Sequence, residues 1–302
     1  MLRLYDSRQR EVILVQPARR GQLSLHTRGP GPSRPAHLGD LRAVLLADLI
    51  RRTAERRQMA VQASLGSSDA GAADGGADHE EHRDHEEHER AFHADCAALG
   101  ARPPEFTSRS ALGDIVDIEV SQADQAGQAD QARQAGQAGQ RPVARHRAVG
   151  GPVLFEGSDP GGPDATATLG ELTRRGLDPL ALRLAFLERR YRDPLDLTWP
   201  ALTRADGALR RWRARVAEWA THPSRPLSAE HTAQVTGAFE DDLDTPAALA
   251  ALRALEDDAA IPPGAKFETF AHVDQLLGLD LASEIGKAPA PARAPAAPPR
   301  PA

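Results

Sequence analysis

The sequence predicts an α/β fold: a shortened, nucleotide-binding-like parallel sheet with a low-complexity insert, followed by an α-helical bundle. Three observations support this prediction. A strand, a crossover helix and a second strand follow one another within about 40 residues, between Leu23 and Gly66. The second half of the chain carries apolar residues at the spacing of packed helices. A segment rich in glutamine and alanine, 121–141, separates the two parts.

The βαβ unit begins with a strand at Leu23–Thr27, where apolar and polar residues alternate. Three prolines between residues 30 and 35 then exclude regular structure and stiffen a loop. The following helix is predicted by an apolar stripe on one face, formed by Leu38, Leu41, Leu45 and Leu49. Met59–Leu65 supplies the second strand. A ligand of such a unit normally binds where the first strand meets the helix, here at residues 28–40.

Further elements are predicted on both sides of this unit. A strand and turn precede it within residues 1–15, and residues 79–100 form a helix that stops at Gly100. In the second half, Asp178 caps a helix that has Pro179 in its first position and ends before Asp193-Pro194. Another helix opens at Thr245-Pro246. Between these two, a helical seam with spacing 4, 3, 4, 3 is formed by Ala205, Leu209, Trp212, Val216 and Trp219.

Two segments lack the large apolar side chains that a packed core needs. The Gln/Ala segment 121–141 is predicted to be disordered or a frayed helix, and the Pro/Ala-rich tail to be disordered. The chain is therefore expected to divide into a first half of a nucleotide-binding domain (1–120), a linker (121–141), a remnant of the second half of that domain (142–170), a helical bundle (171–283) and a tail (284–302).

Composition excludes several classes of function. The net charge of −6 gives no general attraction to nucleic acid, so RNA binding would need a local arginine patch. Cys96 is the single cysteine, which excludes a disulfide framework and a Cys-x-x-Cys zinc site. The sequence has neither an apolar run of about 18 residues nor a signal-peptide core, so we expect a cytoplasmic protein without membrane contact.

One stretch resembles a known family. Gly29-Pro30, followed by Pro35-x-His37-Leu38-Gly39, resembles the start of a cysteinyl-tRNA synthetase, a class I aminoacyl-tRNA synthetase. The resemblance covers residues 1–65, about 91–109 and 146–281. It implies a Rossmann-like domain and an ATP-dependent cysteine–tRNA ligase ancestry, with ATP, cysteine and tRNA as ligands. It also implies a nucleotide-binding role for Gly29, Pro30, His37, Gly39 and Asp40.

The sequence departs from the family's pattern at four places. Arg28 replaces a zinc-binding cysteine, and Asp40 replaces the last histidine of the nucleotide motif. The Gln/Ala spacer stands where the family has its other zinc ligands, and no lysine is present in the loop 158–168, where the family has a Lys-Met-Ser-Lys-Ser motif. A carboxylate in the first helical turn repels phosphate. We therefore interpret the family's zinc site and the aminoacylation activity as lost, which leaves a pseudoenzyme with a binding or regulatory role.

Two alternatives remain open. The protein could be an active ATP-dependent ligase, either a divergent cysteine–tRNA ligase or a relative of the mycothiol-pathway ligases, that uses His37 and Gly39 for ATP. It could also be a metal- or pH-responsive module built on a histidine-rich helix, although a solvated helix face explains that pattern more simply. The candidate ligands on this helix are His79, His82, His85, His88, His93 and Cys96.

The helical half offers a possible contact with a partner protein or with tRNA. Its arginines could grip a tRNA acceptor stem, but the solvated face of helices in an arginine-rich protein is the simpler interpretation. These residues are Arg183, Arg189, Arg190, Arg192, Arg210, Arg211, Arg213 and Arg215.

Overall fold

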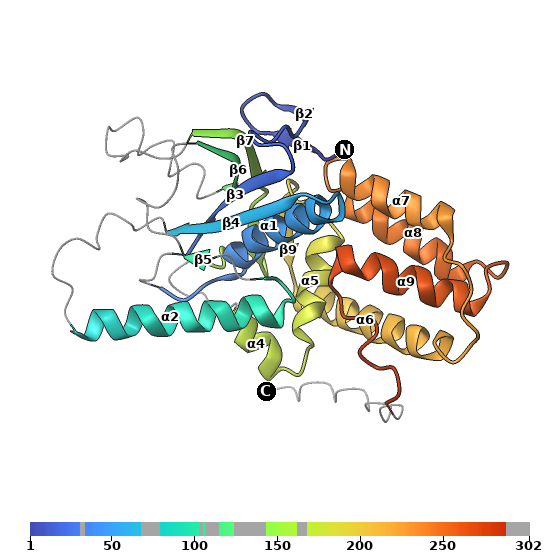
Figure 1. The fold of residues 1–302 in the computed structure, drawn as a ribbon. Coiled ribbons are helices and arrows are strands. Elements are labelled where there is room, and N and C mark those ends of the chain that lie inside the picture. The colour runs from blue at the N-terminus through green and yellow to red at the C-terminus, as the bar shows by residue number, and fades with distance from the viewer. Residues whose placement is uncertain are drawn as a thin grey trace, which may run out of the picture.

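Five parallel strands form the sheet of the N-terminal half, and a bundle of helices lies beside it (Figure 1). The computed structural model describes residues 1–30, 34–67, 79–102, 105–106, 115–123, 143–161 and 168–287. The strand order in the sheet is β5-β4-β3-β6-β7. The strands are β3 (Gln22–Gly29), β4 (Ala60–Ser67), β5 (Glu105–Phe106), β6 (Ile115–Gln122) and β7 (Val143–Gly150). The predicted α/β class is confirmed.

The βαβ unit consists of β3, α1 (Leu38–Arg56) and β4. β3 and β4 pair in parallel from Gln22 opposite Ala60 to Gly29 opposite Ser67. The predicted leucine stripe of α1 is buried, but the burial extends around nearly the whole helix. The reason is that α1 packs on the sheet with one side and against other helices with the opposite side. Polar residues of α1 therefore need partners inside the protein.

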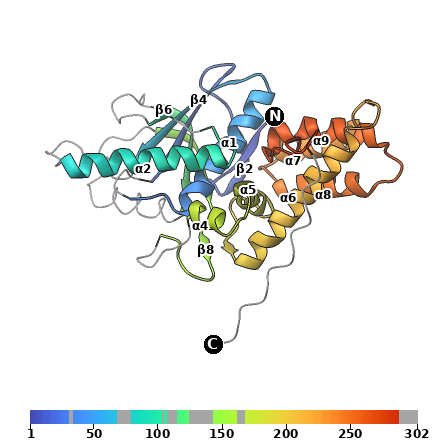
Figure 2. The same cartoon turned by 90° about the horizontal axis from the view of Figure 1, so that it is seen from below.

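The α2 helix (His79–Ala98) runs alongside the sheet and ends next to α1 (Figure 2). The predicted stop is confirmed, because Gly100 has a positive φ of 63°. Such a backbone conformation is accessible to glycine at little steric cost and commonly ends a helix.

A small antiparallel hairpin at the N-terminus, β1 (Arg3–Asp6) and β2 (Glu11–Leu14), connects the sheet domain to the bundle. The backbone N–H of Tyr5 donates to Asp242 Oδ1 at 2.8 Å, and the hydroxyl of Tyr191 donates to the same oxygen at 2.8 Å. Asp242 is buried at the turn that precedes α8. One carboxylate thus holds three distant segments together.

The connection from the sheet to the bundle differs from the prediction. After β8 (Val153–Phe155) and α4 (Leu169–Arg174), α5 begins as predicted at Pro179 but ends at Leu187, well before Asp193. The chain then turns into β9 (Leu195–Leu197), which pairs in parallel with β8. The guanidinium of Arg42 donates to the carbonyls of Arg190 and Asp193 at 3.0 Å each. These carbonyls have a tertiary partner and need no helix, which a local sequence pattern cannot reveal.

Four helices form the bundle: α6 (Trp199–Trp219), α7 (Ala229–Glu240), α8 (Thr245–Asp257) and α9 (Pro263–Leu277). The predicted seam of α6 is confirmed, because all five of its residues are buried. Trp212 and Trp219 both contact Phe270 of α9 edge-to-face, with ring centroids 5.9 and 5.2 Å apart. This packing fixes α9 against α6.

Two predicted boundaries need correction. Ser121 and Gln122, expected in the linker, belong to β6 and are buried. The side-chain amide of Gln122 donates to the carbonyl of Gly151 at 2.7 Å, which gives this polar side chain a partner inside the protein. Residues 284–286, expected in the disordered tail, form a turn, and residue 287 lies in a bend. The rest of the predicted linker, 124–141, and of the tail, 288–302, lies outside the described residues. Within the described ranges, no helix is long and apolar enough to cross a membrane.

Candidate functional site

The natural ligand position of this sheet is at the carboxyl ends of β3 and β6. The chain leaves β3 through α1 to reach β4 on one side, and it returns later to place β6 on the other side of β3. In open parallel sheets, ligands bind outside the strand ends at such a change of direction. Gly29 and Gln122 end the two strands, and His37 at the start of α1 lies close by.

The N-terminal end of α1 is closed by its own side chains. His37 is the N-cap, and its Nδ1 accepts hydrogen bonds from the backbone N–H groups of Gly39 at 3.1 Å and Asp40 at 3.4 Å. Asp40 returns the interaction, because its Oδ2 accepts from the N–H of His37 at 3.0 Å. This reciprocal arrangement is a capping box. The N–H groups of Gly39 and Asp40 are therefore already satisfied by His37 within the first turn.

Arg34 completes the closure. Its guanidinium binds the fully buried carboxylate of Asp40 through two hydrogen bonds, of 2.7 and 3.1 Å. A carboxylate in the first turn stabilises the helix dipole by roughly 0.3–1 kcal/mol and repels a phosphate at the same place. Arg34, which the sequence did not single out, places its positive charge on this carboxylate. The arrangement of Arg34, His37 and Asp40 is referred to below as the α1 box.

Three charged side chains from adjacent strands meet at the same edge of the sheet. The Nε of Arg28 on β3 lies 2.9 Å from Glu119 Oε1 on β6, and the Nε of Arg147 on β7 lies 3.0 Å from Glu119 Oε2. All three side chains are nearly buried. A guanidinium has no lone pair for a metal, so Arg28 cannot replace a zinc-binding cysteine. The residues present at this position do not fit zinc.

The loop after β8 covers His37 with glycine rather than with a cation. A Cβ on Gly161 would lie 2.9 Å from His37 Nε2, so the glycine backbone packs directly against the imidazole ring. The N–H of Gly161 donates to Asp159 Oδ1 at 2.9 Å. No lysine or arginine occurs between residues 148 and 173 of the sequence. The described part of this loop therefore presents a carboxylate near the start of α1.

The histidine-rich helix does not assemble a metal site among the residues whose side chains are described. No group of three or more His, Cys, Asp or Glu side chains is arranged to hold a metal there. Burial, together with Asp95 and Asp48, raises the pKa of the Cys96 thiol to about 12, which disfavours the thiolate that a metal would need. The side chains of His79 and His82 lie outside the described part, so their pairing with His85 and His88 stays a prediction.

The arginines of the bundle are held by carboxylates. Arg183 and Arg213 are buried rather than solvated, which corrects the expectation for these two. Arg183 binds Asp48 at 2.8 Å, and Arg213 binds Asp178 at 2.5 Å. Five others also have carboxylate partners: Arg190, Arg192, Arg210, Arg211 and Arg215.

The functional residues missed by sequence reasoning are Arg34, Glu119 and Arg147. A local pattern could not find them, because their partners come from other elements. Glu119 lies opposite Arg147 in the register of β6 and β7. The available signal was the opposite charges of Glu119 and Arg147, which indicate a contact only when the pairing of their two strands is known.

Solved structures of aminoacyl-tRNA synthetases share this fold. Methionyl-tRNA synthetase of Mycobacterium tuberculosis, solved with bound methionyl-adenylate, superposes with a TM-score of 0.55 at 10% identity, covering 91% of this chain and 95% of that chain. Arginyl-tRNA synthetase of Plasmodium falciparum superposes with a TM-score of 0.53 at 9% identity, covering 88% of this chain and 77% of that chain. At such identities the likeness shows the fold alone, and this fold is that of class I aminoacyl-tRNA synthetases.

Sequence relatives are more specific. The L-cysteine:1D-myo-inositol 2-amino-2-deoxy-α-D-glucopyranoside ligase of Thermobispora bispora is 38% identical over 143 residues, which are 46% of this chain and 34% of that protein. The ligase of the same name from Streptomyces griseus is 41% identical over 114 residues, 36% of this chain and 27% of that protein. The matched region thus spans about a third or less of these curated relatives. No protein-family model matches the chain. The predicted resemblance to the cysteinyl-tRNA synthetases, a family of class I aminoacyl-tRNA synthetases, is confirmed by these cysteine ligases together with the shared fold.

Proposed function

We propose that this protein keeps the scaffold of an ATP-dependent cysteine ligase but no longer activates cysteine, and that it acts by binding in a regulatory role. The α1 box is the observation that carries the proposal. It occupies the helix start, where a nucleotide phosphate would approach in a βαβ unit. A phosphate could reach these N–H groups only by displacing His37 from them.

The charges around His37 also favour loss of cysteine activation by ATP. When a carboxylate attacks ATP, negative charge develops on the departing pyrophosphate, and positively charged side chains or metal ions stabilise it. The nearby groups with described geometry include the carboxylates of Asp40 and Asp159, and the charge of Arg34 is directed at Asp40. On one side of His37 the charges of Asp40 and Arg34 balance, and on the other side Asp159 is negative, so neither side offers the positive charge that a departing pyrophosphate needs.

The buried cluster of Arg28, Glu119 and Arg147 supports the same conclusion with regard to the recognition of cysteine. A soft metal such as zinc would recognise a thiol directly. Here, the strand end carries a guanidinium that is fixed by a buried carboxylate. Selectivity for cysteine therefore lacks the device that the family resemblance implies.

An exchange assay tests the proposal. We expect no cysteine-dependent exchange of pyrophosphate into ATP by the purified full chain with Mg²⁺. Cysteine-dependent exchange that disappears in the His37→Ala variant would contradict the proposal.

A second candidate is favoured by the sequence relatives. Proteins 38% and 41% identical over their matched regions are named as ligases that join L-cysteine to an amino sugar linked to inositol. In this alternative, His37 and Gly39 would bind ATP, and an arginine would act in place of the lysine loop. Incubation with ATP, cysteine and the amino-sugar acceptor distinguishes the two proposals. AMP release that requires both cysteine and acceptor would establish the ligase.

The division into a nucleotide-binding-like domain and a helical bundle stays part of this proposal, with the first half at 1–120, the remnant at 142–170 and the bundle at 171–283. In the binding role, the bundle would offer the surface for a partner protein. ATP, cysteine and tRNA are retained as ligands only in the ligase alternative.

A further inference from the structure

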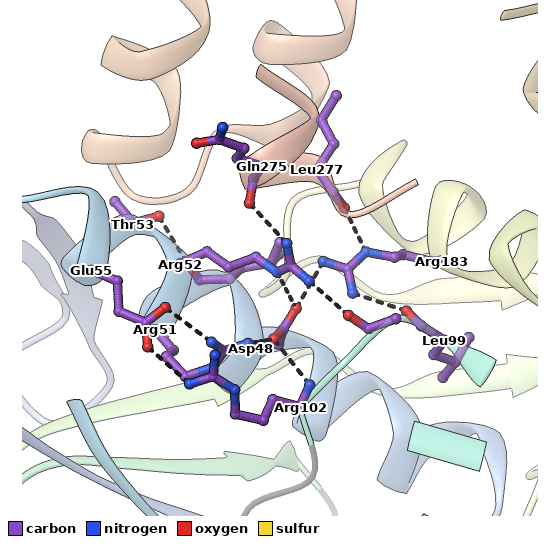
Figure 3. Close-up of polar contacts among 12 residues, drawn as sticks. Asp48, Arg51, Arg52, Thr53, Glu55, Leu99, Arg102, Arg183, Gln275 and Leu277 are labelled. Atoms are coloured by element: carbon purple, nitrogen blue, oxygen red, sulfur yellow. Dashed lines mark hydrogen bonds and ion pairs between the residues drawn. The ribbon is translucent and has the colours of Figure 1, made fainter. Parts of the chain in front are cut away.

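The C-terminal end of α1 borders a cavity of about 570 Å³ on the side of the helix away from the α1 box. The ends of α2 and α9 form its other walls. Its charged lining consists of Arg51, Arg52, Glu55, Arg56 and Arg102. The cavity lined by these five residues is called the arginine cavity below. Figure 3 shows most of the five residues around Asp48.

Two arginines near this cavity have structural roles. The guanidinium of Arg52 donates to the carbonyls of Gln275 at 2.8 Å and Gly100 at 2.7 Å, beside the ends of α9 and α2 (Figure 3). Arg183, fully buried behind it, donates to the carbonyls of Leu277 and Leu99 and to Asp48. Both side chains satisfy carbonyls near the helix ends, so neither is available to a ligand.

The remaining arginines have fewer carboxylates than charges. Asp48 is shared by Arg51, Arg52 and Arg183. Glu55 is shared by Arg51 at 3.0 Å and Arg102 at 3.3 Å. No additional carboxylate of the described residues lies within ion-pair distance of these four arginines.

Arg56 has no carboxylate partner within the described part of the chain. Its guanidinium lies 2.7 Å from Nε2 of His272. Burial and the adjacent charge of Arg56 lower the pKa of His272, so the imidazole is neutral at pH 7 and accepts this hydrogen bond. The charge of Arg56 is therefore uncompensated by its nearest polar neighbour.

The local charge balance is positive. Four guanidinium groups line the cavity with one carboxylate, that of Glu55, so the lining itself has a positive surplus. The C-terminal ends of α1, α2 and α9 carry negative partial charges, and Arg52 and Arg183 bind carbonyl groups at or next to these ends. The whole chain carries −6, so this surplus belongs to the cavity and not to the protein in general.

We propose that the arginine cavity binds a small phosphorylated anion, at a site separate from the carboxyl ends of β3 and β6. Guanidinium groups bind phosphate through paired hydrogen bonds. Among the described residues, Arg56 contacts His272 but no carboxylate, and the one carboxylate partner of Arg102 is Glu55, which Arg51 also binds. The cavity volume lies within the range of about 300–1,000 Å³ that is common for small-ligand sites. The carboxylate of Glu55 now lies between Arg51 and Arg102 and binds both. In the complex, a phosphate group of the ligand displaces this carboxylate.

Calorimetry with inorganic triphosphate on the full chain, at low salt, tests the site without a nucleotide base. We expect saturable binding with one triphosphate per chain. The double variant Arg56→Gln/Arg102→Gln is expected to weaken it at least tenfold. A matched double variant, Arg174→Gln/Arg215→Gln, removes two exposed arginines that form i,i+3 ion pairs elsewhere, and it should bind like the wild type.

Two further variants separate ligand binding from a structural effect. Glu55→Gln removes the internal competitor and is expected to tighten binding several-fold, whereas a purely structural cluster would gain no affinity. His37→Ala should leave triphosphate affinity unchanged, which separates this site from the α1 box. The absence of saturable heat in both wild type and Glu55→Gln, or equal binding by the Arg56/Arg102 double variant, would overturn the proposal. Tighter binding of a short single-stranded RNA per phosphate than of triphosphate would overturn it in favour of a nucleic-acid surface.

Discussion

The two ends of α1 use arginine and aspartate in different proportions. At the N-terminal end, one arginine and one aspartate pair with each other, and His37 and Asp40 satisfy backbone groups of the first turn. At the C-terminal end, Asp48 alone receives three guanidinium groups, and Arg56 next to it receives no carboxylate from the described residues. The first end is balanced, and the second has a positive surplus.

This difference shows where the sequence has moved away from the resemblance. The balanced end coincides with the position that the family resemblance assigns to nucleotide binding, and there the protein satisfies its own polar groups. The end with the surplus lies where the resemblance assigns nothing. The following predictions test the two ends, in order of decreasing effect.

Replacing Asp48 by asparagine should have the largest effect. Burial alone would raise the pKa of Asp48, but Arg183, Arg52 and Arg51 outweigh burial and hold the pKa below its ordinary value. Asp48→Asn would leave the fully buried Arg183 without its carboxylate, at a cost of about 3–5 kcal/mol in unfolding free energy. Urea unfolding at pH 7 measures it. A lowered pKa contributes stability above about pH 4, the unfolded value, that is lost as the pH falls further, so the difference between variant and wild type should shrink in acid.

Glu188→Gln provides the control for Asp48. Its partner Arg253 is about half exposed, and the pair lies on the surface of the bundle. Its loss should change the unfolding free energy by less than about 1 kcal/mol. Similar costs for the two substitutions would show that the burial of Asp48 has no special weight.

Opening the α1 box should have the next largest effect. Asp40→Ala removes the acceptor for the His37 N–H and the partner of Arg34, which should cost about 2 kcal/mol of unfolding free energy. The same change removes a negative charge from the helix start, so calorimetry should detect tighter ATP binding than in wild type. Glu171→Ala, which removes a first-turn carboxylate of α4 on the surface, should do neither. Unchanged ATP affinity in Asp40→Ala would mean that the box is not what closes the site.

Asp95 gives a smaller, pH-dependent effect near the C-terminal end of α1. Burial raises the pKa of Asp95 to about 6. Because the folded value is raised, the contribution of Asp95 to stability is present below about pH 4 and is lost as the pH rises through 6. Asp95→Asn should therefore stabilise the protein at pH 8 by about 1 kcal/mol, after allowance for its partial exposure, and should have little effect at pH 4. Thermal unfolding across this pH range measures the difference. Asp84→Asn, on the exposed face of the same helix, should show no such trend.

The smallest effect concerns the contact between the loop and His37. Gly161→Ala places a methyl group against the imidazole, and a small shift of this side chain should cost a few tenths of a kcal/mol to about 1 kcal/mol. The NMR chemical shifts of the His37 ring should change. Gly207→Ala, where a Cβ meets open space within α6, should instead stabilise the protein by about 0.5–1 kcal/mol. An unchanged His37 spectrum in Gly161→Ala would place the loop away from the ring.

Part of the candidate site could be read from the sequence. The helix start at Leu38 follows from the apolar spacing, and the structure has it where the pattern predicts. The replacement of the zinc cysteine by Arg28 was also visible. Glu119 was not, because its relation to Arg28 depends on the pairing of β3 with β6, which are about 90 residues apart in the chain and have no local signal for it.

The sequence by itself determined the elements of this protein: the βαβ unit, the seam of α6 and the glycine that stops α2, all of which depend on interactions between near neighbours in the chain. Only the tertiary structure decided which charges meet. Arg183 and Asp48 are 135 residues apart. From the sequence of its own helix alone, each would be predicted to lie on the solvated surface. Burial turns them into a pair, because removing either one would leave a charge that water cannot reach. The arginine cavity arises for the same reason, since three helix ends have to converge before their arginines can outnumber the carboxylates.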